Sequence, residues 1–138
     1  MIDSFDRFLG AEEPCACFHD AMLVSLQIHY ERRELISEWR LYVGDATDPD
    51  RDVRERMRCG RLRLTGLAFW VVEPHDELLD GRGPWLVSDG PLLDAGTDRA
   101  RELSKLVPPG ASAWYLYFSD WNAHAYCSAE GGTFEWIE

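Results

Sequence analysis

The sequence predicts an α+β domain that is mostly β: a single curved antiparallel sheet of about six or seven strands with one or two short helices packed on it. Residues 18–43 contain two runs of alternating apolar and polar residues around a charged turn, which is typical of a long antiparallel hairpin. The C-terminal third alternates in the same way between turn residues. A chain of 138 residues that is 46% hydrophobic can build one core, so we expect a single domain over residues 1–138.

The N-terminal residues predict a short helix that lies on the sheet. Asp3 or Ser4 can cap a turn that carries Phe5 and Phe8, and Gly10 can end it. The first hairpin strand follows, and its alternating apolar residues are expected on one buried face: Met22, Val24, Leu26, Ile28 and Tyr30. The second strand buries a matching set: Leu35, Trp39, Leu41 and Val43. Residues 44–51 are rich in turn formers and predict a connection.

Residues 58–74 predict a third strand that changes phase partway. Leu62 and Leu64 alternate with arginines, whereas Leu67, Phe69 and Val71 have the opposite parity, so we expect a bulge or bend near Thr65–Gly66. Both parities are apolar beyond this point, which indicates that both faces are covered.

A helix over Thr97–Val107 is the best candidate for the covering element. Thr97 can cap it and Pro108 follows it. Its expected apolar stripe consists of Ala100, Leu103, Leu106 and Val107.

The remaining strands are shorter. Residues 74–96 form a loop rich in Gly, Pro and Asp with short strands near Trp85–Val87 and Leu92–Leu93. Three strands then follow: Ala113–Phe118, Ala123–Ser128 and Thr133–Ile137. We expect turns between them at Asp120–Asn122 and at Gly131–Gly132.

Charge restricts the class of partner. The formal net charge of −11 disfavours binding to nucleic acid or anionic lipid and favours a basic protein. One Arg-rich run lies within residues 51–63, and we interpret it as solvated surface paired with Asp and Glu rather than as a phosphate site: Arg51, Arg54, Arg56, Arg58, Arg61 and Arg63. No apolar run reaches the roughly 20 residues that span a bilayer. The acidic N-terminus does not resemble a signal peptide, so we expect a cytoplasmic protein with reduced cysteines.

A metal site is not expected, and neither is a cofactor. Cys15, Cys17 and His19 stand two residues apart and could join His124 and Cys127 as zinc ligands. However, the three-residue step from His124 to Cys127 places those side chains on opposite faces of a strand. The cysteines are therefore interpreted as core or edge thiols.

No motif completes a catalytic site. His19 and Asp20 would point to opposite faces of an extended strand and so could not pair, which favours a structural role for both. His75 lies beside two acids in the predicted loop, without a second cluster. Ser88–Asp89–Gly90 is interpreted as a turn because it lacks the glycine before the serine of a nucleophile elbow.

Residues 18–72 resemble a group of small bacterial domains. In these domains a Phe-His-Asp motif opens a hairpin, here Phe18, His19 and Asp20, and a later strand carries a short apolar-Gly run, here at Gly66. Some of these domains are similar to the mostly-β immunity proteins of polymorphic toxin systems. The resemblance implies a function in binding and silencing a basic toxin.

We therefore expect a non-catalytic protein-interaction domain. Trp121 would anchor the partner and nearby acids would steer it, which makes the candidate binding residues Asp120, Trp121, Glu130, Glu135 and Glu138. One alternative is a small-ligand protein or an enzyme with a pocket between the sheet and residues 74–96, built from His19, Asp20, His75 and His124. The other is a structural homodimer that pairs through a strand edge.

Overall fold

A folded antiparallel sheet forms the body of the protein. The structure is a computed structural model and describes residues 3–76 and 83–138. The sheet has eight strands in the order β4-β7-β6-β5-β1-β2-β3-β8. The strands are β1 (Ala21–His29), β2 (Glu34–Tyr42), β3 (Met57–Thr65), β4 (Phe69–Val72), β5 (Trp85–Pro91), β6 (Ser112–Phe118), β7 (Ala123–Ala129) and β8 (Gly131–Trp136). The mostly-β antiparallel prediction is confirmed, but six or seven strands was too few.

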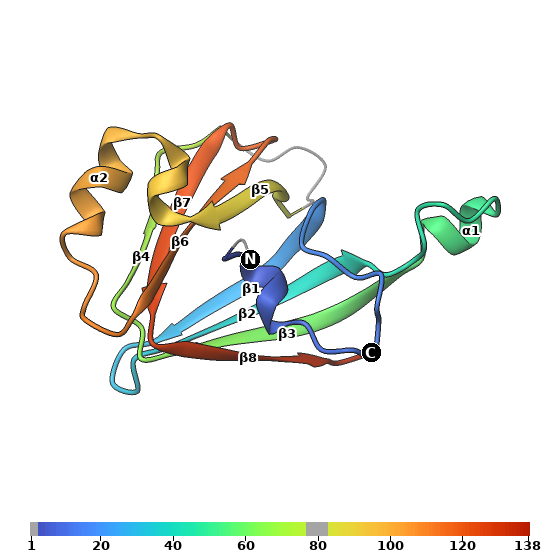
Figure 1. Cartoon of the computed structure of the whole chain (residues 1–138), viewed down its shortest axis with the longest axis horizontal. Helices are drawn as coiled ribbons and strands as arrows, with labels where there is room; N and C mark the ends of the chain where they lie inside the picture. Colours follow the sequence, from blue (N-terminus) through green and yellow to red (C-terminus); the bar gives the residue numbers. More distant parts are fainter. Residues whose placement is uncertain (1–2, 77–82) are drawn as a thin grey trace.

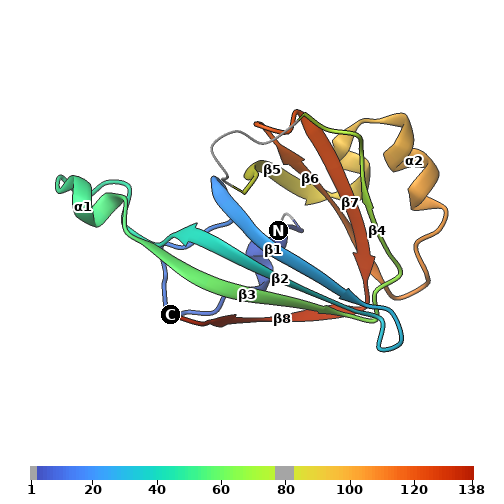
Figure 2. The same cartoon turned by 180° about the vertical axis from the view of Figure 1, so that it is seen from behind.

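The sheet bends into two halves that face each other (Figures 1 and 2). The first half-sheet consists of β1, β2, β3 and β8, and the second of β4, β5, β6 and β7. Only two residue pairs, Ala21 with Leu86 and Met22 with Trp85, connect the halves through β1 and β5. Side-chain packing between the halves therefore has to hold them together.

The sharpest bend lies where β3 passes into β4 and β7 passes into β8. Thr65 pairs with Gly131 and Phe69 pairs with Ser128, so three residues, 66–68, lie opposite two residues, 129–130. The extra residue is the bulge expected near Thr65–Gly66, and Gly66 there has φ +61°. The bend is strong enough to put β3 and β4 in different halves, which explains the additional strand. The joint between β7 and β8 is Glu130, whereas the predicted turn residues Gly131–Gly132 already belong to β8.

Aromatic side chains fill the wedge between the halves. Trp39 of β2 lies 5.2 Å from Phe18 and 6.3 Å from Phe118 of β6, measured between ring centroids. Phe5 packs edge-on against Trp114 at 5.6 Å. Phe5 belongs to the 3-10 helix η1 (Phe5–Phe8), which Ser4 caps as predicted and which ends at Leu9 rather than at Gly10.

The first hairpin strand contains a bulge that the alternating pattern did not reveal. The β1–β2 register shifts between Leu23 and Ser25, and Leu23 is buried while Met22 lies on the opposite face across from Arg40. Val24 is 48% exposed and Tyr30 is 82% exposed. The predicted buried face of the first strand is therefore wrong at Met22, Val24 and Tyr30, whereas that of β2 is confirmed.

A second, smaller core lies on the outer face of the second half-sheet. Helix α2 (Asp98–Ser104) and the 3-10 helix η2 (Leu92–Ala95) cover this face. Ala100 and Leu103 of α2 pack with Phe69 and Val71 of β4, as the two apolar parities of that strand predicted. Leu106 lies beyond the helix end and is 66% exposed, which corrects the predicted stripe.

One other prediction about local structure is wrong: Leu92–Leu93 begins η2 instead of forming a strand, because Pro91 ends β5 there. The connection expected over residues 44–51 is turn-rich through residue 50, and the short helix α1 (Arg51–Arg54) then follows. This segment projects away from the sheet at the end of β2 and β3 (Figure 1), and we call residues 44–56 the arm. None of the helices in the described residues is long and apolar enough to cross a membrane.

Replacing Gly60 by Ala should destabilise the protein, because a Cβ atom there would lie 2.1 Å from the Phe134 ring. We expect a loss of about 1–3 kcal/mol in the free energy of unfolding, measured by urea denaturation. Gly10→Ala is the control, because a Cβ at Gly10 meets nothing within 4 Å. Equal stabilities of the two variants would contradict the packing of Phe134 on Gly60.

Candidate functional site

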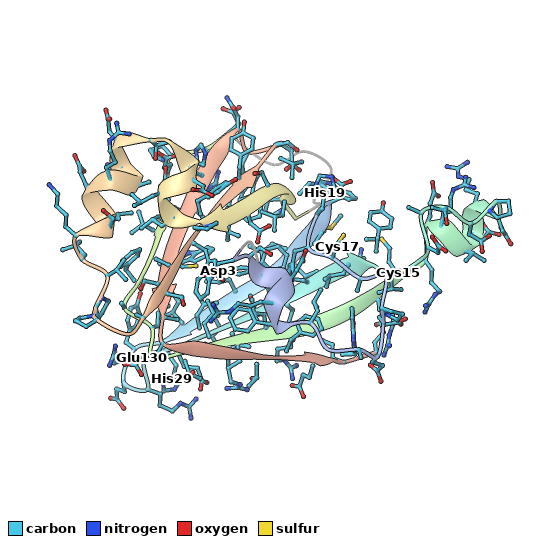
Figure 3. All side chains as sticks on the ribbon, in the orientation of Figure 1. Asp3, Cys15, Cys17, His19, His29 and Glu130 are labelled. Atoms are coloured by element: carbon cyan, nitrogen blue, oxygen red, sulfur yellow. The ribbon has the colours of Figure 1, made fainter. Side chains whose placement is uncertain are left out.

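An open cleft of about 360 Å³ lies where the N-terminal segment meets the base of the arm. Its lining is chemically diverse: Cys15, Cys17, His19, Asp20, Tyr42, Gly44, Asp45, Ala46 and Arg54. Cys15, Cys17 and His19 follow one another along this segment (Figure 3). The cleft therefore contains His19 and Asp20 of the Phe-His-Asp motif, whereas Phe18 is buried in the core.

His19 and Asp20 approach each other, contrary to the prediction that they could not pair. Asp20 has φ +63°, so the backbone turns just before β1 and brings the Asp20 carboxylate within 3.5 Å of His19 Nε2. Nδ1 of His19 lies 2.9 Å from the carbonyl oxygen of Val87, to which it can only donate. A carboxylate also only accepts, so the contact with Asp20 becomes a hydrogen bond when Nε2 carries a proton.

All four cysteines are free, and two of them have perturbed pKa values. Burial raises the pKa of the Cys17 thiol, with a further contribution from the Asp6 carboxylate. Cys127 is completely buried in the core, which raises its pKa strongly. Neither thiol is prepared to act as a nucleophile, because the reactive species is the thiolate.

No metal cluster is present in the part of the chain that the structure describes. No group of three or more His, Cys, Asp or Glu side chains there is placed to hold an ion. Cys15 is exposed at the cleft while Cys127 is enclosed in the core.

The other two candidate histidines have different surroundings from His19. The His75 ring stacks on Trp121 with centroids 4.0 Å apart, whereas His124 faces outward from β7, with Nδ1 3.3 Å from the Glu73 carboxylate. The predicted pocket between the sheet and residues 74–96 is also wrong in part. Residues 85–91 of that stretch form β5 inside the sheet, and residues 77–82 lie outside the described residues.

The five candidate binding residues do not form one surface. Asp120 and Trp121 lie at the turn before β7, and Glu130 lies at the far end of the same strand. Asp120 accepts a hydrogen bond from the backbone N–H of Trp85 at 2.8 Å. The Trp121 ring packs between His75 and Phe118. Glu135 and Glu138 lie on and after β8 in the other half-sheet.

Each of the three glutamates has an arginine close by. Glu135 pairs with Arg61 at 3.1 Å, and Glu130 lies 4.0 Å from Arg33. The backbone carbonyl of Glu138 accepts a hydrogen bond from Arg58. The negative potential around β8 is therefore locally compensated.

Arginines of the run in residues 51–63 pair with acidic side chains, in agreement with the prediction that this run is solvated surface. Arg58 and Arg56 both contact Glu13 at 3.0 Å, and hydrogen bonds from Arg56 and then Arg58 lower the pKa of that carboxyl group. Arg61 bridges Glu38 and Glu135, and Arg63 pairs with Glu34.

Two features were missed from the sequence. Asp89 lies inside β5 rather than in a turn, and its Oδ2 accepts a hydrogen bond from the backbone N–H of Phe5 at 2.8 Å. Burial raises the pKa of Asp89 to about 6, although the bond from Phe5 acts in the opposite direction. The only signal was an acid at an inward position of a short strand. The second missed feature is the arm, of which only residues 44–51 had been interpreted, as a turn-rich connection.

Comparisons with known proteins show no family. No family model matches the chain, and no curated protein matches it. This chain is similar to the crystal structure of an uncharacterized protein from Neisseria gonorrhoeae, with 12% sequence identity and a TM-score of 0.43. The alignment covers 87% of this chain and 94% of the Neisseria chain. We transfer neither fold nor function at this level of similarity.

Substitutions at Asp20 should separate its backbone role from its carboxylate. Asp tolerates the left-handed conformation better than Ala because its short side chain can hydrogen-bond locally, so Asp20→Ala should lower the free energy of unfolding by about 1–2 kcal/mol, measured by urea denaturation. Asp20→Gly removes the same carboxylate but tolerates the positive φ, and should remain closer to the original stability. If Asp20→Gly and Asp20→Ala lower the free energy of unfolding by the same amount, then Asp20 stabilises the protein through its carboxylate and not through the left-handed turn.

Alkylation should distinguish the cysteines by access. We expect iodoacetamide to modify exposed Cys15 first, half-buried Cys17 more slowly, and Cys127 only after unfolding in urea, because burial excludes the reagent and suppresses the thiolate. Peptide mass spectrometry over time measures each rate. Modification of Cys127 in the folded protein at the rate of Cys15 would contradict its placement in the core.

Proposed function

We propose that this protein is a non-catalytic interaction domain that binds a basic protein through its acidic arm. The observation that carries the proposal is the projection of the arm from the sheet (Figure 2), because a projecting element is accessible to a partner from several sides. The arm, residues 44–56, contains five acidic and three basic residues. The arm thus concentrates negative charge at one end of the molecule.

The charge of the arm is less compensated than that of β8. Within residues 3–76 and 83–138, the exposed acids Asp45, Asp50 and Asp52 have no basic side chain within ion-pair distance. By contrast, Glu135 faces Arg61 and Glu130 faces Arg33. Uncompensated exposed charges steer association more effectively than charges that are already paired.

Local hydrogen bonds hold the arm acids in place. Asp45 accepts bonds from the backbone and side chain of Thr47, which lower the pKa of its carboxyl group. Asp50 accepts a bond from the backbone N–H of Asp52 and caps α1. Preorganised carboxylates lose less side-chain entropy when they contact a partner.

The resemblance of residues 18–72 to immunity proteins supports a narrower form of the proposal. The partner would be a basic nuclease toxin, since an enzyme that holds nucleic acid presents positive charge. An acidic arm that occupies this positive surface would exclude the substrate.

A small-ligand function has one observation in its favour, the cleft of about 360 Å³ beside His19 and Asp20. Native mass spectrometry of the purified protein distinguishes the two functions. A retained small molecule supports the cleft, whereas a retained basic protein supports the arm.

Neutralising the arm should reduce capture of the partner. The triple variant Asp45→Asn, Asp50→Asn and Asp52→Asn removes three charges while the amide oxygens preserve the acceptors for the Thr47 and Asp52 N–H groups. We expect the tagged original protein to retain a basic protein from its native lysate at low salt and to lose part of it at high salt, and the triple variant to retain less. Mass spectrometry of the retained proteins is the measurement.

The matched control removes the same number of charges elsewhere: Glu130→Gln, Glu135→Gln and Glu138→Gln. It should retain the partner nearly as well as the original protein, because these acids lie beside arginines. A greater loss in the control than in the arm variant would place the interface at β8. Capture that is equal in all three proteins would exclude electrostatic binding.

A further inference from the structure

Strand β8 forms one border of the sheet. It ends the strand order, and among the described strands only β3 pairs with it. β8 follows the lower border of the molecule in both views (Figures 1 and 2). Its register with β3 runs without a bulge from the pair Gly60 and Trp136 to the pair Thr65 and Gly131. β8 therefore presents a regular edge along its whole length.

The hydrogen-bond alternation along β8 identifies the backbone groups that point away from β3. One residue past the end of β8, the N–H of Ile137 donates to the Cys59 carbonyl of β3 at 3.0 Å. In an antiparallel ladder, residues that bond to the neighbouring strand alternate with residues whose N–H and C=O point away from it. The odd-numbered residues of β8 therefore bond to β3, and the backbone groups of the even-numbered residues point out of the sheet: Gly132, Phe134 and Trp136. Within residues 3–76 and 83–138, no strand or side chain bonds to these outward groups.

This edge lacks the features that usually prevent a sheet from pairing with another chain. Natural edge strands are commonly very short, bulged, or protected by Pro or Lys. β8 contains neither Pro nor Lys, and its register is continuous. The strand at the opposite border, β4, has only four residues. An added strand therefore finds the longer free edge at β8.

The outer face beside the β8 edge contains charges of both signs. Glu135 pairs with Arg61 at 3.1 Å, and its side chain remains 61% exposed. Arg63 lies opposite Thr133 in the β3–β8 register and pairs with Glu34, but a guanidinium has more donors than this pair uses. Both arginines line an open hollow of about 380 Å³ together with three residues of β8. The edge thus offers an exposed carboxylate at one position and a guanidinium with free donors two residues away.

Backbone geometry selects one way for two β8 strands to pair. In a symmetric antiparallel pair, a residue faces one of the same parity, because both side chains point to the same face of the sheet. Only the pair centred on Phe134 joins all the outward residues of β8: Phe134 faces its own copy and Gly132 faces Trp136. A pair centred on Thr133 leaves Trp136 without a partner in β8, and a pair centred on Glu135 places two carboxylates opposite each other.

We propose that two copies of this chain associate through β8, in an antiparallel pair centred on Phe134 that continues the sheet from one copy into the other. Glu135 of each copy then lies opposite Thr133 of its partner, whose Arg63 is on the next strand. The carboxylate is placed between Arg61 of its own copy and Arg63 of the other, so the charges of the two edges complement each other. The arm takes no part in this pair and stays free for a basic protein.

Sedimentation velocity of the full chain tests the association. A single pair of short strands buries less than the roughly 1,000 Å² of a permanent interface, so we expect a reversible dimer. Its fraction should rise between about 10 µM and about 1 mM protein at about 0.15 M salt, where ions screen the repulsion between two chains of net charge −11. A protein that remains monomeric over this whole range would overturn the proposal.

Opposite charges at Thr133 test the register. Thr133→Glu places a carboxylate opposite Glu135 of the partner at two symmetric positions, and should raise the dissociation constant about tenfold. Thr133→Lys places an ammonium there and should leave the constant within about twofold or lower it. Gln27→Glu is the control, because it adds one negative charge at an exposed position of β1, inside the sheet, and should have little effect.

Three results from these variants would overturn the proposal: no change in Thr133→Glu, an equal loss in Thr133→Glu and Thr133→Lys, or an equal loss in Thr133→Glu and Gln27→Glu. Thr133 is exposed, so its variants should melt near the temperature of the original protein.

Amide hydrogen exchange tests the pair without any substitution. The amides of Phe134 and Trp136 point out of the sheet and should exchange more slowly at about 1 mM than at about 10 µM protein, because the second copy accepts their hydrogen bonds. The amides of Thr133 and Glu135 already donate to β3 and should change less. Protection of Phe134 and Trp136 that does not depend on concentration would contradict the pairing, including in the case that Thr133→Glu fails to fold.

Discussion

Phe5 and Phe18 fill the space that the two half-sheets leave between them. The halves share only two residue pairs between β1 and β5, so their relative position depends on side chains in the wedge. Each phenylalanine is fully buried, and burial of such a side chain contributes about 1.5–3 kcal/mol. Both lie edge-on to Trp39, which belongs to the first half-sheet, and Phe5 also contacts Trp114 of the second. A segment near the N-terminus thus completes a core that its sheet cannot complete alone.

The tryptophan side chains and the backbone that fill the wedge bring hydrogen-bond donors into a region from which water is excluded. Trp39 Nε1 donates to the Ser37 hydroxyl at 2.8 Å, and Ser37 donates onward to the Leu62 carbonyl. The Phe5 N–H has no such neutral partner and uses Asp89. An unsatisfied buried donor costs about 1–3 kcal/mol, and the Asp89 carboxylate removes that cost for the Phe5 N–H. Burial at this position in turn raises the pKa of Asp89 to about 6.

Local periodicity predicted those elements whose structure is decided locally. The β2 face, the Thr97 cap of α2 and the strands of the C-terminal third follow from alternation and capping within a few residues. The bulge at Val24 and the division of residues 57–72 into β3 and β4 depend on register with other strands, which no single run reveals. The site was less predictable still. The bond between Asp89 and Phe5 joins residues 84 apart in sequence, and the His19–Asp20 contact depends on a left-handed turn where an extended backbone was assumed.

Pairing within the fold determines how much of the net charge a partner can encounter. Composition alone suggested that the arginines of residues 51–63 would be basic and that the chain near β8 would be acidic. The fold brings Arg61 between Glu38 and Glu135 and brings Arg56 and Arg58 to Glu13, so both regions compensate each other. Among the described residues, Asp45 and Asp50 of the arm have no basic side chain within ion-pair distance, and they accept hydrogen bonds from nearby backbone N–H groups instead. Because the strands carry the arginines into the sheet, the excess negative charge remains on the element that projects from it.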